Sequence, residues 1–383
     1  MHSLPRKWPR TIVAALVALG GAGAVPAIAS AQSGQASHVY VNDNTAGTNT
    51  VAGFVRRGDG SLTPLPGSPF SAGGAGAGSG LASQGAIQVS SNGRYAISVD
   101  AGSNQVSVLR IESDGSLQVA DVVSSGGIQP VSVAEHNGLV YVANAGAGAG
   151  GSNYTGFTLG VDGTLRPLAD STVALPDDAQ PGDVLFNSTG TNLVGTRVGS
   201  SEIDSFSVGS DGRLTAAPGS PFAAQGFGPF GSEFRPTNPS QLFVSNAHND
   251  PGLGTVSAYD VAADGTLSSI GSSPFADQQT APCWVEITHS GRFLFTVNTG
   301  SGSISRYSIA PNGNLTLLGS TAVSSQGGVG AVDARLSADD QTLYVDESRV
   351  GAVGEFSVQG GQLTEQGSVS LPAGATPAGI AVR

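Results

Sequence analysis

The chain contains very little lysine and cysteine, and each shortage excludes a class of chemistry. Its only lysine is Lys7, and its only cysteine is Cys283. A single cysteine cannot form an intramolecular disulfide, so the fold must be stabilised by packing. Beyond Lys7, the chain can supply neither a Schiff-base nucleophile nor the phosphate-binding lysine of a P-loop.

Acidic side chains outnumber basic ones in this chain. Sixteen lysines and arginines face 28 aspartates and glutamates, which gives a formal charge of −12. Nucleic acids and anionic membranes are bound through basic residues that neutralise phosphate. We therefore expect no nucleic-acid partner.

The N-terminal segment has the composition of a secretory leader. Three basic residues precede an apolar run at 12–25, and Ala29-Ser30-Ala31 offers a cleavage site. We predict a Sec-type signal peptide at 1–31, cleaved near Ala31, and one domain at 32–383 of a secreted bacterial protein. The alternative is a retained anchor, although the apolar run is short and rich in glycine and alanine. Cleavage would lower the formal charge to −15, because only basic residues are lost.

A short turn motif recurs along the chain, and its spacing predicts the fold. The successive copies lie 55, 48, 49, 53, 48 and 48 residues apart. The seven copies begin with Asp-Gly-x-Leu or a close variant at Asp59, Asp114, Asp162, Asp211, Asp264, Asn312 and Gly360. Seven repeats of about fifty residues, in a glycine-rich chain with few strong helix formers, predict an all-β, seven-bladed β-propeller.

The sixth repeat illustrates the predicted blade. Four antiparallel strands are expected at 282–287, 292–297, 303–309 and 315–318. Asp-Gly and Asn-Gly are the favoured dipeptides of two-residue hairpins whose central residues both have φ > 0, so we predict such turns between third and fourth strands.

The two ends of the domain are expected to complete one blade together. Residues 376–382 match a first strand with nothing after it, and 38–42 match a second strand with nothing before it. Joining them would close the ring without an exposed sheet edge.

The repeats also resemble a known family. The turn Ser90-Ser91-Asn92-Gly93-Arg94-Tyr95, the Asp-Gly-x-Leu motif and the phrases at 66–70 and 218–222 are similar to those of lactonase-type seven-bladed propellers. That family includes propeller 6-phosphogluconolactonases and 3-carboxymuconate-cyclising enzymes. The resemblance covers the whole predicted domain and implies a hydrolase that acts on a small lactone.

The family's motif positions are altered in this chain. The resemblance would place Gly-Pro-Arg-His at the start of one first strand, where the sequence reads Gly228-Pro229-Phe230-Gly231. The Asn-Glu expected at the end of the next strand is Asn246-Ala247-His248, and the expected Pro-His of the preceding blade is Pro181-Gly182-Asp183. No catalytic residue of the family can therefore be carried over unchanged.

Strand direction indicates where a site could form. Loops that enter first strands and loops that leave second strands lie on the same face of the disc, around the channel. Asn and Asp at second-strand ends could cap local turns, whereas Arg197 and Glu347 break this pattern and are candidate ligand-binding residues. The second-strand ends are Asn42, Asp100, Asn144, Arg197, Asn246, Asn298 and Glu347.

First strands of the last two blades offer further candidates. Trp284 and Glu286 alternate along one strand and could point into the channel, where burial beside an indole would raise the pKa of the carboxyl group. Alternatively, Trp284 wedges between blades and Glu286 pairs with a neighbouring arginine. Asp333 and Arg335 alternate likewise and form either a salt bridge or part of a site. His248, on a loop of the site face, is either functional or simply exposed.

Two other histidines are expected on the face opposite the site. His136 and His289 fall in first-to-second strand turns on the opposite face, so we do not expect them in the site.

Our leading hypothesis is lactone hydrolysis of a sugar or carboxymuconate-type substrate at the channel. Glu286 or His248 would activate water, Arg197 or Arg335 would bind the substrate carboxylate or oxyanion, and other polar groups would assist binding. The alternative is a non-catalytic binding propeller that has lost the family's active-site residues. The proposed substrate-binding residues are Arg197, Asn246, Trp284, Asn298, Asp333, Arg335 and Glu347. We expect a monomer that binds a small molecule, with no cofactor, no metal and no membrane insertion after signal cleavage.

Overall fold

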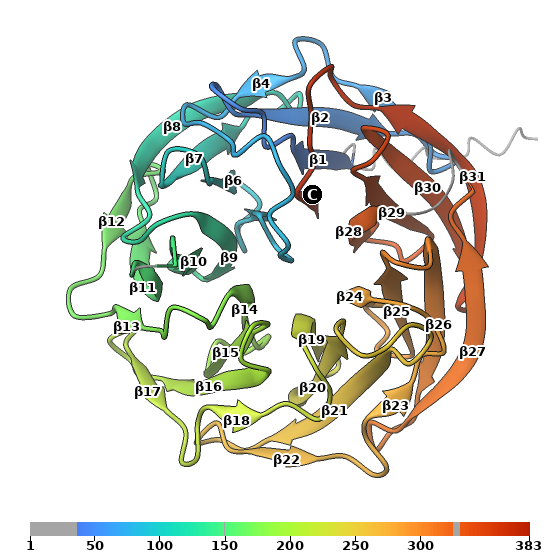
Figure 1. The fold of residues 1–383 in the computed structure, drawn as a ribbon. Helices are drawn as coiled ribbons and strands as arrows, with labels where there is room; N and C mark the ends of the chain where they lie inside the picture. Colours follow the sequence, from blue (N-terminus) through green and yellow to red (C-terminus); the bar gives the residue numbers. More distant parts are fainter. Residues whose placement is uncertain (1–36, 149, 325–329) are drawn as a thin grey trace, which may run out of the picture. The chain divides into compact units, whose positions relative to one another are not determined.

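Four-stranded antiparallel blades are arranged in a ring around a central channel (Figure 1). The computed structural model describes residues 37–148, 150–324 and 330–383, and within them there are seven such sheets and no helix. The predicted signal peptide lies outside the described residues. None of the described segments forms a helix long and apolar enough to cross a bilayer.

The strands of each blade follow one another from the channel outward. The innermost strands are β5 (Ile87–Val89), β9 (Pro130–His136), β14 (Pro181–Phe186), β19 (Pro229–Arg235), β24 (Pro282–Ile287), β28 (Ala331–Leu336) and β32 (Gly379–Val382). The second strands are β1 (His38–Asn42), β6 (Tyr95–Asp100), β10 (Leu139–Ala145), β15 (Asn192–Arg197), β20 (Asn238–Asn246), β25 (Phe293–Asn298) and β29 (Thr342–Glu347).

The outer half of each blade is partly interrupted. The third strands are β2 (Thr50–Arg56), β7 (Gln105–Ile111), β11 (Ser152–Leu159), β16 (Glu202–Val208), β21 (Thr255–Val261), β26 (Ser303–Ile309) and β30 (Ala352–Gln359). Three blades have one continuous outer strand, namely β8 (Leu117–Ser124), β27 (Leu315–Ala322) and β31 (Gln362–Ser370). In the other four blades, two short pieces pair with the third strand: β3 (Leu62–Pro64) and β4 (Phe70–Ser71), β12 (Leu165–Pro167) and β13 (Val173–Ala174), β17 (Leu214–Ala216) and β18 (Phe222–Ala223), β22 (Leu267–Ser269) and β23 (Phe275–Ala276).

The predicted closure of the ring is confirmed. β32 pairs antiparallel with β1, with Val382 opposite Val39 and Gly379 opposite Asn42. His38 and Arg383 also exchange backbone hydrogen bonds of 3.2 and 2.9 Å. The two ends of the domain therefore share one sheet, in which β1 is paired along both of its edges.

The turn type predicted for the repeated motif is wrong in detail. Gly60 has a φ of +91°, but Asp59 does not have a positive φ. The Arg57 N–H donates to the Ser61 carbonyl, and the Gly60 N–H donates to the Arg57 carbonyl, so the loop has three residues and ends in a left-handed glycine. Asp59 instead accepts the Ser61 N–H at 3.0 Å, which is the role of an Asx turn.

These turns also join neighbouring blades. Tyr40, Tyr141 and Tyr344 are fully buried on second strands, and each hydroxyl donates to a glycine carbonyl in the Asp-Gly turn of the next blade. The distances are 2.8, 2.9 and 2.7 Å. The recurring glycine thus serves both the hairpin and the contact between blades.

Candidate functional site

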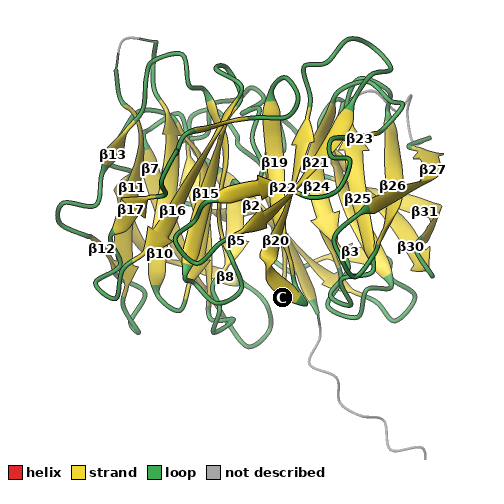
Figure 2. Cartoon of the chain, turned by 90° about the horizontal axis from the view of Figure 1, so that it is seen from below, coloured by secondary structure: helices red, strands yellow, loops and turns green. Residues whose placement is uncertain are grey.

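The inner strands run parallel to one another, so equivalent residues form layers along the channel. Each inner strand starts at the face where loops enter it, here named the loop face, and ends at the face of the first-to-second turns, the turn face (Figure 2). In β24, Pro282 pairs with Asn298 at the loop face, and Ile287 pairs with Leu294 near the turn face. Glu286, the fifth residue of β24, therefore lies near the turn face.

A small cavity at the turn face gathers most of the channel's charged groups. We name it the acidic pocket; its volume is about 150 Å³. Glu233, Glu286 and Arg335 are each the fifth residue of their inner strand, in three consecutive blades. The pocket is lined by Glu233, Pro236, Glu286, Ile287, His289, Arg335, Leu336, Ala338 and Val382.

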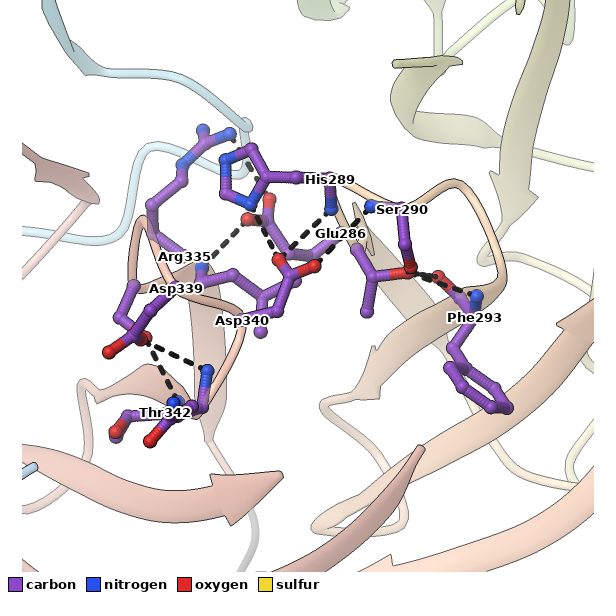
Figure 3. A network of polar contacts seen from close by, with 12 residues as sticks. Glu286, His289, Ser290, Phe293, Arg335, Asp339, Asp340 and Thr342 are labelled. Atoms are coloured by element: carbon purple, nitrogen blue, oxygen red, sulfur yellow. Dashed lines mark hydrogen bonds and ion pairs between the residues drawn. The ribbon is translucent and has the colours of Figure 1, made fainter. Parts of the chain in front are cut away.

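Glu286 is held by its neighbour blade. Nη1 of Arg335 lies 3.1 Å from Oε2 of Glu286, and the Leu336 N–H donates to Oε1 at 2.7 Å (Figure 3). Glu286 is 4% exposed, and the side chain of Arg335 is 29% exposed. Burial raises the pKa of Glu286, while Arg335 opposes this shift. The predicted pairing of Glu286 with an arginine is therefore present, and it faces a cavity.

Glu233 supplies a second carboxyl group to the pocket. Burial raises the pKa of Glu233 well above its usual value, and the neighbouring charge of Glu286 raises it further. Two nearby carboxyl groups in different surroundings tend to hold different protonation states. Glu233 therefore holds its proton more tightly than an ordinary glutamate, although the charge of Arg335 and a backbone hydrogen bond from Ile287 oppose this shift. Glu286 differs in having a direct ion pair with Arg335.

His289 also lines this pocket, contrary to the sequence-based exclusion. It does lie on the face opposite the loop face, but Glu286 and Arg335 lie near that face too. Its Nδ1 is 2.5 Å from Oδ1 of Asp340, and its backbone N–H donates to the same oxygen at 2.9 Å (Figure 3). Asp340 thereby orients the ring at the outer edge of the pocket.

The middle of the channel holds two more buried carboxyl groups. Asp183 accepts hydrogen bonds from the backbone and hydroxyl of Ser232 at 3.0 and 2.7 Å. Burial raises the pKa of Asp183 to about 7 and that of Asp333 to about 6. Asp333 accepts backbone N–H groups of Gly85 and Ile380. Among the described residues no ion pair joins Asp333 to Arg335, so the salt bridge, one of the two alternatives for this pair, is not formed.

A loop crosses the channel above these carboxyl groups. Gln84 is 4% exposed; its amide donates to the Ser232 carbonyl at 2.9 Å and accepts the Val285 N–H at 2.9 Å. Its own N–H donates to the Gly182 carbonyl at 2.8 Å. We name residues 81–85 the central loop, since they bridge three inner strands.

Most of the predicted loop-face residues have internal partners. Arg197 binds Asp204 through two hydrogen bonds of 2.7 and 2.6 Å and also contacts Glu202 at 3.3 Å. Asn246 and Asn298 are fully buried and donate to hydroxyl groups of the adjoining third strands. Arg197 is therefore an internal ion-pair residue. Both asparagines tie the second strand to hydroxyl groups of the third strand, rather than capping the backbone of the turn as the sequence suggested.

The other candidates are separated from Glu286. Glu347 is buried at the end of β29, and His248 is exposed in the loop after β20, at the loop face. Trp284 packs edge-on against Phe230, with ring centroids 5.1 Å apart, and lines a different cavity from Glu286. The indole is thus not the group that desolvates Glu286.

Sequence reasoning missed Glu233 and excluded His289. The fifth residues of the last three complete inner strands read Glu, Glu, Arg, and this alignment was the available signal for Glu233. His289 could have been placed by counting from Glu286 to the strand end. No group of three or more His, Cys, Asp or Glu side chains in the described residues is arranged to hold a metal ion.

Comparisons with known proteins agree on the architecture. A family model described as "Lactonase, 7-bladed beta-propeller" matches residues 193–382. A Bacteroides uniformis structure, provisionally assigned as a 6-phosphogluconolactonase, is 18% identical with a TM-score of 0.73, covering 91% of this chain and 100% of that one. A Pseudomonas aeruginosa periplasmic gluconolactonase is 16% identical with a TM-score of 0.70, covering 90% and 98%. No curated protein matches the chain.

Proposed function

Because this chain belongs to the lactonase-type seven-bladed β-propeller family, we propose that it hydrolyses a small lactone in the acidic pocket. The observation that carries the proposal is that two carboxyl groups and a guanidinium share one cavity, with different surroundings for each carboxyl group. Such pairs permit assignment of an acid and a base. The location rests on this chain's own residues, because the family's motif positions fall at the loop face and are altered.

Each step of lactone hydrolysis has a candidate group in the pocket. Water must lose a proton as it adds to the carbonyl carbon, and Glu286 is the base that accepts it. Negative charge then develops on the carbonyl oxygen, and Arg335 stabilises it. When the ring C–O bond breaks, neutral Glu233 donates a proton to the leaving oxygen. The product is a hydroxy acid, and proton exchange with solvent restores both carboxyl groups.

The cavity size bears on the substrate class. About 150 Å³ accommodates a single small ring, since an apolar cavity of similar volume can hold benzene. Larger substituents would have to extend past His289 toward solvent. We therefore propose a five- or six-membered lactone, with sugar and carboxymuconate-type lactones as the first compounds to assay.

The test is hydrolysis by the purified protein across a panel of these lactones. We expect turnover that Glu286→Gln lowers by about 100-fold or more, the usual size of a general-base contribution. Glu355→Gln is the matched control, because Glu355 also accepts a backbone N–H of the next blade, at 2.7 Å from Leu62, but lies outside the pocket. Absence of turnover in a folded sample would refute the proposal and favour a non-catalytic binding propeller. Turnover that the two variants change equally would refute the acidic pocket as its site.

Secretion is a separate proposal. The basic start, the apolar run and Ala29-Ser30-Ala31 favour export followed by cleavage near Ala31. The mass and N-terminal sequence of protein recovered from the culture medium of a producing bacterium would test it. Retention of the full-length chain in the cells would contradict it.

A further inference from the structure

A second cavity opens at the loop face, at the opposite end of the channel from the acidic pocket. Its volume is about 270 Å³, and its walls include Leu81, Phe230, Trp284 and Val332. Phe230 stands where the family resemblance would place an arginine. We name this space the loop-face cavity and ask which ligand its walls could bind.

The walls are fixed by contacts within the protein. The indole N–H of Trp284 donates to the Ser83 carbonyl at 2.9 Å, and the Ser83 hydroxyl donates to the Val131 carbonyl at 2.7 Å. Phe230 and Trp284 are 4% and 5% exposed and meet edge to face at 65°. An aromatic pair held in this way is preformed, so a ligand would not have to order it.

The hydroxyl and indole donors around the cavity are already used. The hydroxyls of Thr299 and Ser348 each donate at 2.9 Å, to the carbonyls of Ala331 and Gly330 respectively. With Ser83 and Trp284 also committed, the lining hydroxyl oxygens can only accept. None of the described lining residues carries a charge. An anionic ligand would therefore lose its hydration without gaining a cation or a free hydroxyl or indole donor.

We propose that the loop-face cavity binds a neutral aromatic molecule of one or two fused rings, such as a phenol or naphthol. Its rings would contact Phe230 and Trp284, and a hydroxyl on it would find oxygen acceptors. A lactone ester has only acceptors and would find no free hydroxyl or indole donor here. The proposal does not rest on lactone hydrolysis, because the central loop and the mid-channel carboxyl groups lie between the two cavities.

Calorimetric titration of the full-length protein with 2-naphthol tests this inference. We expect saturable one-to-one binding, and at least about tenfold weaker binding of 2-naphthoate, which adds a carboxylate to the same rings. Bound naphthol should also change the fluorescence of Trp284, measured in a Trp8→Phe background because the chain has two tryptophans.

Two variants locate the binding. Val332→Phe should fill the cavity and weaken naphthol binding by about tenfold or more, a change of about 1.4 kcal/mol. Val350→Phe is the control, since Val350 is 37% exposed and does not line the cavity. Melting temperatures of both variants verify folding, and the fluorescence response of wild-type protein provides a second measurement if Val332→Phe does not fold.

Several outcomes would overturn the inference. One is that 2-naphthol does not bind up to about 1 mM, and another is that 2-naphthoate binds with equal affinity. The others are an equal loss of naphthol affinity in the two valine variants, and calorimetric binding without a change in Trp284 fluorescence. Lactone turnover by Val332→Phe would remain intact if the two sites are independent, so failure here and failure of the lactonase proposal can be told apart.

Discussion

At the scale of single residues, the acidic pocket depends on the different surroundings of two glutamates at equivalent strand positions. Glu286 receives a guanidinium and a backbone N–H, whereas Oε2 of Glu233 has no hydrogen-bond partner within the described part of the chain. A buried carboxylate oxygen without a partner is costly, so the pKa of Glu233 is raised well above its usual value. The neutral carboxyl group is then available as an acid at the pH where its neighbour is a base.

This difference predicts the pH dependence of lactone hydrolysis. The kcat/KM should rise as Glu286 ionises, above the usual glutamate range because its pKa is raised, and fall at higher pH as Glu233 ionises. Glu286→Gln should remove the acidic limb of the profile, and Glu233→Gln the alkaline limb. Steady-state rates across pH measure both, with Glu355→Gln as the control. Unchanged limbs in the glutamine variants would contradict the assignment.

Part of the acidic pocket could be predicted from the sequence, and part could not. Glu286 and Arg335 stood out because charged residues alternate with apolar ones on predicted inner strands, and their positions in the chain were sufficient to place them near the channel. Glu233 can be recognised as a pocket residue only when strands β19, β24 and β28 are aligned by position. Arg197 broke the asparagine pattern for a local reason, its pairing with Asp204, which strand spacing alone could not reveal.

At the scale of elements, the repeated Asp-Gly turn determined the fold because it serves two functions at once. Its spacing identified seven blades, and the strand-like ends of the domain indicated the shared blade. The strands β24, β26 and β1 have the predicted bounds. The predicted backbone conformation was wrong because Asp59 acts through its side chain, accepting the Ser61 N–H and hydroxyl. Local turn geometry depends on such contacts, whereas the repeat period does not.

The contact between blades at this turn predicts a measurable stability loss. Tyr344 on β29 donates to the Gly60 carbonyl across the junction where the ring closes, and Tyr344→Phe would leave that carbonyl without its donor. We expect a decrease of about 1–2 kcal/mol in the free energy of unfolding, measured by denaturant titration. Tyr344→Leu, which also removes the ring, should lower stability further. A Phe variant as stable as the wild type would show that the hydrogen bond contributes little.

At the scale of the whole molecule, parallel inner strands divide the channel into chemically distinct levels. The loop-face level contains Phe230 and Trp284, the middle contains Asp183 and Asp333, and the turn-face level contains the acidic pocket. Trp284 is the third residue of its inner strand, as are Asp183 and Asp333, but it lines the loop-face cavity. A propeller can hold different ligands at its two ends because different residues of its inner strands line each end. The middle level carries buried acids between the two, and their titration affects the stability of the entire ring.

The mid-channel acids predict that stability decreases from about pH 4 to about pH 7. The pKa of Asp183 rises from 3.8 to about 7 on folding, so the folded state binds a proton more tightly than the unfolded chain. The associated stability is fully present below pH 3.8 and is lost as the pH rises through the folded value.

Asp183→Asn, which keeps the size but cannot ionise, should flatten the decrease and raise the melting temperature at pH 7. Asp59→Asn is the opposite control, because hydrogen bonds from Ser61 lower the pKa of that exposed carboxyl group, so its contribution is lost only toward acid pH. Calorimetric melting curves across this range measure the effect, and a wild type and Asp183→Asn variant with parallel pH profiles would mean that Asp183 does not titrate in the folded channel.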